Sequence, residues 1–230
     1  MNSKKIRVWD LPTRLFHWLL VLAVLALVVT GKVGGNLIDW HGRIGVGLAG
    51  LIAFRLVWGV AGSTYARFGQ FFPTPARISA YLRRGHRGVG HNPLGALSVF
   101  ALLGLLSIQL LTGLVANDDI AFVGPLFDLV GRDLSNVATG WHKAVVNLLI
   151  LLVALHIAAI VFYARVKKDN LVKPMLTGWK EVNEGETAQG GGWLALLVAL
   201  AIAGLAVYLA SGSWLPEPPP PPPAVETPAW

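Results

Sequence analysis

Long apolar runs separated by short polar segments dominate the chain. Five runs, at residues 15–31, 44–61, 94–116, 144–163 and 193–209, have the length and composition of membrane-crossing segments, since a helix needs about 20 apolar residues to span a bilayer. Helices satisfy their own backbone hydrogen bonds, which the hydrocarbon interior requires because it offers no water. The pattern therefore predicts an all-α integral membrane protein with five transmembrane helices.

Basic residues fall mainly on one side of these predicted helices. Fourteen of the 19 Lys and Arg residues lie in the amino-terminal segment, the loop between the second and third helices, and the segment after the fourth. By the positive-inside rule these parts are cytoplasmic. We expect a multi-pass membrane protein with a cytoplasmic N-terminus and, after five crossings, a C-terminus on the external side. The net charge of +7 then reports topology, and no nucleic-acid partner is expected.

Composition narrows the chemistry that the chain can support. Hydrophobic residues make up 54% of the chain and charged residues 13%, so the lipid bilayer, and not water, is the expected partner of most of the surface. The absence of cysteine excludes iron–sulfur clusters, thiolate metal sites and covalently attached c-type haem. Any bound metal must therefore be held mainly by histidine or oxygen ligands.

Four histidines in or beside the predicted helices form two levels across the membrane. His142 and His156 are fourteen residues apart, so a helix places them on one face, about 21 Å apart. The predicted topology sets His41 level with His142 on the external side, and His17 level with His156 on the cytoplasmic side. Each level has two imidazoles from different helices, as bis-histidine ligation of a haem iron requires. The sequence therefore predicts two non-covalent b haems, although His41 or His142 alone is also typical of a membrane interface.

Arg55 is a further ionisable residue within an apolar run. It follows His41 by fourteen residues, so it shares the face of that residue about 21 Å deeper, at the cytoplasmic histidine level. A guanidinium suits a carboxylate, and each haem carries two propionates. We expect Arg55 to bind a haem propionate; the alternative is an arginine that snorkels to the cytoplasmic surface.

Two other cations and a glycine-rich stretch surround the external histidines. Arg43 and Lys143 flank these histidines in the sequence, and we expect them to meet the propionates of the external haem. Gly45, Gly47 and Gly50 follow in the second helix. They would let a flat macrocycle approach the backbone, or equally would allow two helices to pack closely.

Two histidines match neither level. His86 and His91 lie in the basic loop between the second and third predicted helices. We interpret them as loop residues, with a proton-relay role beside a quinone pocket as the alternative.

The order of the segments predicts a domain organisation. Residues 1–180 are expected to form a four-helix transmembrane haem-binding bundle, and 181–192, which end in three glycines, a flexible linker. Residues 193–215 are expected to form a fifth, peripheral transmembrane helix, and 216–230 a proline-rich external tail. Polyproline is stiff, so the tail is interpreted either as an extended spacer or as a disordered end.

Several motifs occur in the order typical of one family. They are Val8-Trp-Asp-Leu-Pro-Thr-Arg-Leu-Phe-His17-Trp, Trp40-His41-Gly-Arg, Arg55-Leu-Val-Trp-Gly, Gly90-His-Asn-Pro-Leu-Gly95, Trp141-His142, Leu155-His156 and Lys167-Lys-Asp-Asn-Leu-Val-Lys-Pro-Met. From residue 5 to about 178 the chain resembles the bacterial di-haem cytochrome b561 proteins and the b-type cytochrome subunits of nickel–iron hydrogenases. The resemblance implies a four-helix core that binds two b haems through His17, His41, His142 and His156. It also implies electron exchange with membrane quinone and a partner redox protein. A member of this family is expected in the bacterial inner membrane, so the external C-terminus would be periplasmic.

These observations predict transmembrane electron transfer through two b haems. The expected electron partners are the quinone pool and a periplasmic redox protein, either a c-type cytochrome or a hydrogenase-like subunit. The chain would then be a quinone-linked electron-transfer subunit more than a stand-alone enzyme, and no catalytic side chain is expected. Two alternatives remain open: a superoxide oxidase that passes electrons to ubiquinone, and a non-redox, histidine-bearing membrane transporter.

Overall fold

The computed structural model describes residues 3–84, 88–120 and 122–216 of the 230-residue chain. His86 and the predicted tail from residue 217 onward lie outside the described residues. Helices account for most of the described chain, and five of them are long and apolar enough to cross a membrane. The predicted all-α membrane fold is therefore confirmed.

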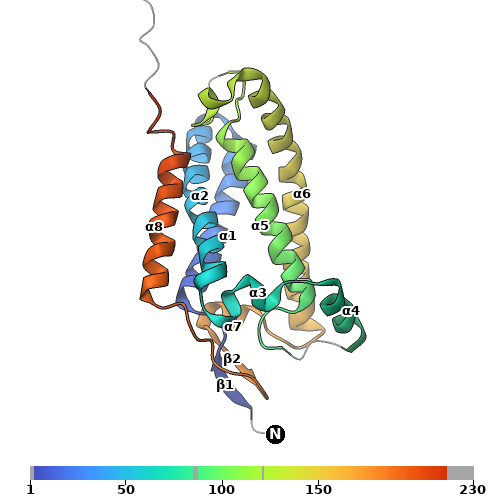
Figure 1. Ribbon diagram of the computed structural model, residues 1–230. Coiled ribbons are helices and arrows are strands. Elements are labelled where there is room, and N and C mark those ends of the chain that lie inside the picture. The colour runs from blue at the N-terminus through green and yellow to red at the C-terminus, as the bar shows by residue number, and fades with distance from the viewer. Residues whose placement is uncertain (1–2, 85–87, 121, 217–230) are drawn as a thin grey trace, which may run out of the picture.

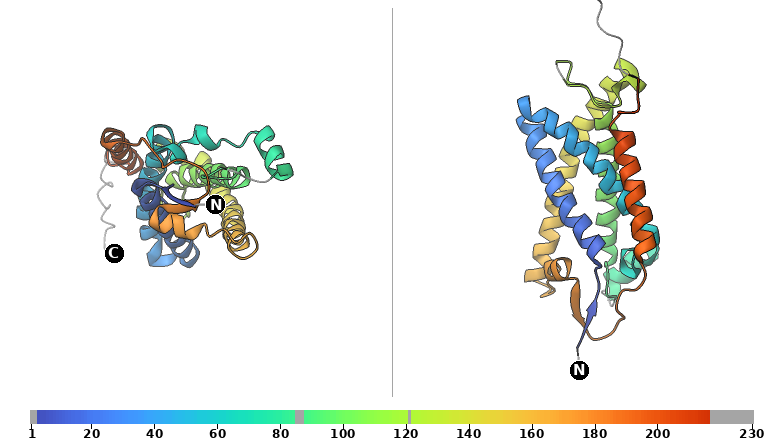
Figure 2. Two further views of the ribbon diagram at one scale, coloured as in Figure 1. Left: turned by 90° about the horizontal axis from the view of Figure 1, so that it is seen from below. Right: turned by 90° about the vertical axis from the view of Figure 1, so that its left-hand side faces the viewer.

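Four long helices form a bundle, and a fifth lies against its outside, as Figure 1 and Figure 2 show. The bundle consists of α1 (Leu11–Val33), α2 (Ile38–Ala61), α5 (Pro93–Leu114) and α6 (Gly131–Arg165). The fifth helix is α8 (Trp193–Ala210). It ends at the opposite end of the molecule from the first strand (Figure 1).

Shorter elements gather at the two ends of the bundle. An antiparallel sheet of β1 (Lys4–Arg7) and β2 (Trp179–Val182) lies at one end, with α3 (Phe68–Phe71), α4 (Pro75–Arg84) and α7 (Val172–Thr177) (Figure 1). Short 3-10 turns are η1 (Gly35–Leu37), η2 (Thr64–Ala66) and η3 (Phe127–Leu129). We call the end that carries the sheet the inner end and the opposite end the outer end.

Local sequence signals explain where the helices begin. The Asp10 carboxylate accepts a hydrogen bond from the Thr13 amide at 2.7 Å and caps α1, and Asn92 caps α5 in the same way.

Two helices begin earlier than the apolar runs of the sequence indicate. Helix α2 begins six residues before its apolar run, and α6 begins thirteen residues before its run. Hydropathy detects only the part of a helix that lies in hydrocarbon, so the polar first turns escaped the sequence pattern. His41 and His142 consequently lie within helices.

The segment before α8, which the sequence predicts to be a flexible linker, forms hydrogen bonds with other parts of the chain. β2 continues into residues whose backbone is hydrogen-bonded along the inner end: the Ala188 amide donates to the Arg7 carbonyl, and the Thr64 amide donates to the Gln189 carbonyl, each at 2.8 Å. The Tyr65 hydroxyl donates to the Glu186 carbonyl at 2.7 Å. These bonds tie the part of the segment that precedes the three glycines to the start of the chain and to η2. The flexibility of the glycines themselves stays a prediction.

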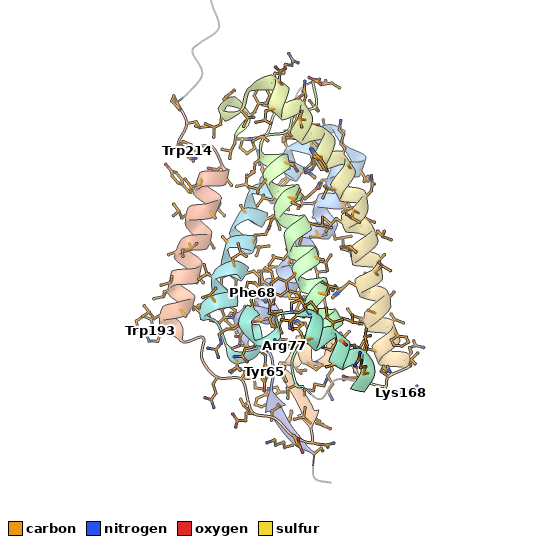
Figure 3. The ribbon with its side chains drawn as sticks, turned by 45° about the vertical axis from the view of Figure 1, so that its right-hand side comes forward. Tyr65, Phe68, Arg77, Lys168, Trp193 and Trp214 are labelled. Carbon is orange, nitrogen blue, oxygen red and sulfur yellow. The ribbon has the colours of Figure 1, made fainter. Side chains whose placement is uncertain are left out.

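Helix α8 packs tightly on α2. A Cβ atom built on Gly50 would lie 2.7 Å from Val207 Cγ2 and 3.3 Å from the Ala203 carbonyl oxygen, so a glycine lets the two backbones approach. Ala199 of α8 is fully buried. Trp193 and Trp214 lie at the two ends of α8 (Figure 3), as interfacial tryptophans do in membrane proteins. The predicted fifth helix therefore exists, and it shares a packed interface with the bundle.

This packing predicts a position-specific effect within α2. Replacing Gly50 by leucine should separate α8 from α2 and lower stability by about 1–3 kcal/mol, the usual cost of overpacking. Gly47→Leu is the matched control, because no described atom lies within 4 Å of a Cβ built at Gly47. Thermal unfolding in detergent measures both variants. Equal unfolding temperatures for the two would contradict the close contact.

Candidate functional site

The outer pair consists of His41 on α2 and His142 on α6. Their ring centroids are 6.0 Å apart, and their ring planes are nearly perpendicular at 84°. Both rings line a cavity of about 300 Å³ between the bundle helices, which is otherwise mainly apolar. Its size is at the lower limit of small-molecule and cofactor pockets, and two convergent polar groups in an apolar lining are typical of such pockets.

Each ring of the outer pair is seated against a glycine of the neighbouring helix. A Cβ atom built on Gly31 would lie 2.9 Å from His41 Cε1, and one built on Gly113 would lie 2.8 Å from His142 Cε1. The Nε2 atoms are farther away, at 3.8 Å and 3.7 Å. Only a residue without a side chain leaves room for these rings, so α1 fixes the position of His41 and α5 fixes the position of His142.

Hydrogen bonds settle which nitrogen of each outer ring carries the proton. His41 Nδ1 is 3.0 Å from the Leu27 carbonyl oxygen, and His142 Nδ1 is 2.9 Å from the Gln109 carbonyl oxygen. A carbonyl can only accept, so each Nδ1 is the donor. The Nε2 lone pair of the neutral ring is then free to bind a metal.

The inner pair consists of His17 on α1 and His156 on α6. The two rings lie close enough to interact electrostatically. Ser98 Oγ is 3.4 Å from His156 Nδ1. His17 Nδ1 is buried and has no hydrogen-bond partner among the described residues. The structure therefore brings together the same two pairs that the levels in the sequence predict, but it supports their rings differently.

Arg55 is a buried cation at the inner level. Arg55 is only 5% exposed. Its guanidinium lies over Phe68, with Cζ 4.4 Å from the ring centroid. Phe68 lies toward the inner end of the bundle (Figure 3). The Nη1 atom of Arg55 is buried without a hydrogen-bond partner among the described residues. The arginine therefore does not reach solvent, and it retains a free donor for an acidic ligand.

A carboxylate accompanies this arginine. Asp10 is 8% exposed and lies within electrostatic range of Arg55. It accepts a hydrogen bond from Trp58 Nε1 at 3.0 Å. Since Asp10 also caps α1, this bond fixes the start of α1 against α2 and so helps to place His17, two turns further along.

The cations near the outer pair separate into two kinds. Lys143 lines the cavity, whereas Arg43 is absent from the lining and has its Cζ 5.5 Å from the Trp40 ring centroid. Lys32 lines the cavity as well, and the sequence did not single it out. Lys32 directly follows Gly31 at the end of α1. This position indicates a place beside the outer pair only once Gly31 is known to face His41.

The glycines of α2 also separate by role. Gly45 lines the cavity, and no described atom lies within 4 Å of a Cβ built there. Gly50 instead meets α8. Close helix packing is therefore the observed role of Gly50, while the approach of a flat macrocycle to the backbone beside Gly45 stays a prediction.

His91 lies in a loop, as predicted, and packs between the rings of Trp9 and Phe71, at centroid distances of 4.8 and 4.4 Å. Within the described residues no three His, Cys, Asp or Glu side chains converge as a metal site. Histidine pairs are therefore the arrangement that the structure offers to a metal.

Comparisons with known proteins agree with this architecture. The sequence pattern of the family described as prokaryotic cytochrome b561 matches residues 8–178. A probable Ni/Fe-hydrogenase B-type cytochrome subunit of Cupriavidus necator is 25% identical over 219 residues, which cover 78% of this chain and 88% of that protein. The protein of the same description from Azotobacter vinelandii is 25% identical over 215 residues, covering 76% and 88%. A probable Ni/Fe-hydrogenase 1 B-type cytochrome subunit of Escherichia coli K12 is 20% identical over 219 residues, covering 78% and 92%.

No solved structure gives a significant match. The family match includes all four histidines of the two pairs and the whole four-helix bundle. Together with the five membrane-crossing helices, it identifies a multi-pass bacterial membrane protein that transfers electrons through haem b. The chain belongs to the prokaryotic cytochrome b561 family.

Proposed function

We propose that this chain carries electrons across the membrane through two b haems, both within residues 1–180. The outer pair, His41 and His142, would hold one haem, and the inner pair, His17 and His156, would hold the other. Along α6 the two ligand positions are about 21 Å apart, from a rise of about 1.5 Å per residue. The N-terminus would be cytoplasmic, so that the outer pair faces the periplasm.

The separation of the outer rings is the observation that carries this proposal. A bond between imidazole nitrogen and a first-row metal is about 2 Å long, so two rings on opposite sides of one metal have centroids about 6 Å apart. The centroids of His41 and His142 are 6.0 Å apart. The open space beside Gly45 adds room for a flat group at the same level. The residues present therefore fit a haem between the outer rings.

The side chains have distinct roles in this proposal. A bound haem supplies one-electron chemistry at its iron. The four histidines would hold the two irons, and the apolar bundle would exclude water. Arg55 would bind a propionate of the inner haem with its unpartnered Nη1. Lys143, together with Lys32, would meet the outer propionates, while the expected role of Arg43 stays a prediction.

Each of the two haems would exchange electrons with its own partner. We propose that membrane quinone exchanges electrons with one haem and that an external redox protein exchanges electrons with the other. The relatives described as Ni/Fe-hydrogenase cytochrome subunits favour a hydrogenase-type partner, with a c-type cytochrome as the alternative. Membership of a cytochrome family argues against the alternative that the chain is a non-redox transporter.

A second candidate function is oxidation of superoxide at the outer haem, with electrons passed to ubiquinone. Lys32 and Lys143 in the cavity lining favour it, because two cations would attract a small anion. Asp118 in the same lining opposes it. Rapid mixing with superoxide would distinguish the two functions, since only an oxidase would show haem reduction that is coupled to turnover.

The pairing of ligands predicts selective loss of each haem. His142→Ala should disturb the outer haem and leave the inner one largely intact, and His17→Ala should do the reverse, because each change would remove an iron ligand from one site only. Redox titration followed by visible absorption shows which midpoint potential survives. If both variants lose the same haem, the pairing is wrong.

Arg55 should raise the midpoint potential of the inner haem. A buried positive charge favours the reduced haem, so Arg55→Leu should lower this midpoint potential. A tenfold change in the equilibrium between oxidised and reduced haem corresponds to about 59 mV. Arg43→Leu is the control, since Arg43 lies over Trp40 near the outer end. An inner potential that stays unchanged in Arg55→Leu would remove Arg55 from the inner site.

A further inference from the structure

The two rings of the outer pair share one form of support, although they come from different helices. On α1, Thr30 precedes the seating glycine Gly31; on α5, Thr112 precedes Gly113. In both cases the carbonyl that accepts from Nδ1 belongs to the residue four positions before the glycine. The same arrangement therefore occurs twice around one cavity.

The threonine hydroxyls are oriented to accept from the rings. Thr30 Oγ1 lies 2.7 Å from the Ala26 carbonyl oxygen, and Thr112 Oγ1 lies 2.7 Å from the Ile108 carbonyl oxygen. Each hydroxyl proton is thereby directed to its own helix, and an oxygen lone pair remains. His41 Nδ1 and His142 Nδ1 are each 3.3 Å from these hydroxyls, so every outer Nδ1–H has a carbonyl and a hydroxyl as acceptors.

The inner pair lacks this support. His156 Nδ1 has Ser98 Oγ at 3.4 Å, and His17 Nδ1 has no partner among the described residues. A hydrogen bond from Nδ1–H to an acceptor makes the opposite nitrogen a more basic ligand. A more basic ligand favours the more positively charged, oxidised iron. Buried Arg55 at the inner level acts in the opposite direction and favours the reduced iron, and the nearby Asp10 carboxylate offsets part of this effect.

Resting on the function proposed above, we propose that the pairs Thr30-Gly31 and Thr112-Gly113 position the outer ligands and set the outer haem at a lower midpoint potential than the inner haem. Lys32 and Lys143 near the outer pair do not cancel this order. Both are exposed residues, and solvent and salt screen exposed charges far more than a buried one. Transfer from the outer to the inner haem is then the downhill direction.

Removing the hydroxyls tests this proposal without changing side-chain size. The double variant Thr30→Val, Thr112→Val should raise the outer midpoint potential, with at least a tenfold change in the oxidation equilibrium, and leave the inner one unchanged. The conservative changes to serine should restore the outer potential, because they keep the acceptor. Ser107→Ala is the matched control on the same helix α5: it removes a hydroxyl whose one bond among the described residues goes to the Leu103 carbonyl of its own helix.

Filling the seat tests the glycines. Gly113→Ala should push the His142 ring and lower the outer haem content or shift its potential, while Gly104→Ala on the same helix should change neither. No described atom lies within 4 Å of a Cβ built at Gly104. Pyridine haemochrome analysis and redox titration of purified full-length protein measure both quantities. If Gly113→Ala does not fold, the threonine variants alone decide.

The outcomes separate this inference from the function on which it rests. Unsubstituted protein without two haems would end the proposed function itself. Two haems with the outer potential above the inner one, or an outer potential that ignores the loss of both hydroxyls, would overturn the inference and leave the function standing. Assignment of each potential to a site comes from the variants that lack His142 or His17.

Discussion

Hydrogen bonds from the Nδ1 atoms of His41 and His142 to helix carbonyls hold the rings on which the outer site depends. A ring held in this way keeps one tautomer and presents one nitrogen to the cavity. The bonds form only because Gly31 and Gly113 let the rings reach the backbones of α1 and α5. The cavity therefore lies where α1 packs on α2 and α5 packs on α6, and the rings of His41 and His142 approach each other there.

The membrane environment explains why the site is built between helices. Hydrocarbon forces every backbone group into a helix, so functional side chains project from helix faces into the space between them. The bundle must then be kept in register from its ends. At the inner end the Asp10–Trp58 bond joins α1 to α2, and the β1–β2 sheet joins the start of the chain to the segment after α6. Helix α8 adds a packed wall along α2.

The sequence was sufficient for the helices and for the two histidine levels, because apolar runs and fourteen-residue spacings are local properties of the chain. It was insufficient wherever a residue acquires its role from a distant partner. Lys4 pairs with Val182 in the sheet, and neither short strand has a recognisable pattern. The segment before α8 forms hydrogen bonds with Arg7, Thr64 and Tyr65, and these partners are far away in the sequence. Lys32 and the threonine–glycine seats gain meaning only from the rings that approach them.

The haem content of the purified protein tests the central claim most directly, because four histidines in two pairs can complete two sites and no more. Pyridine haemochrome analysis, set against protein mass, should give two haem b per chain, and the visible spectrum should show the low-spin bands of iron with two imidazole ligands. A ratio of one would remove one histidine pair from the pathway. A ratio of zero would contradict the account as a whole.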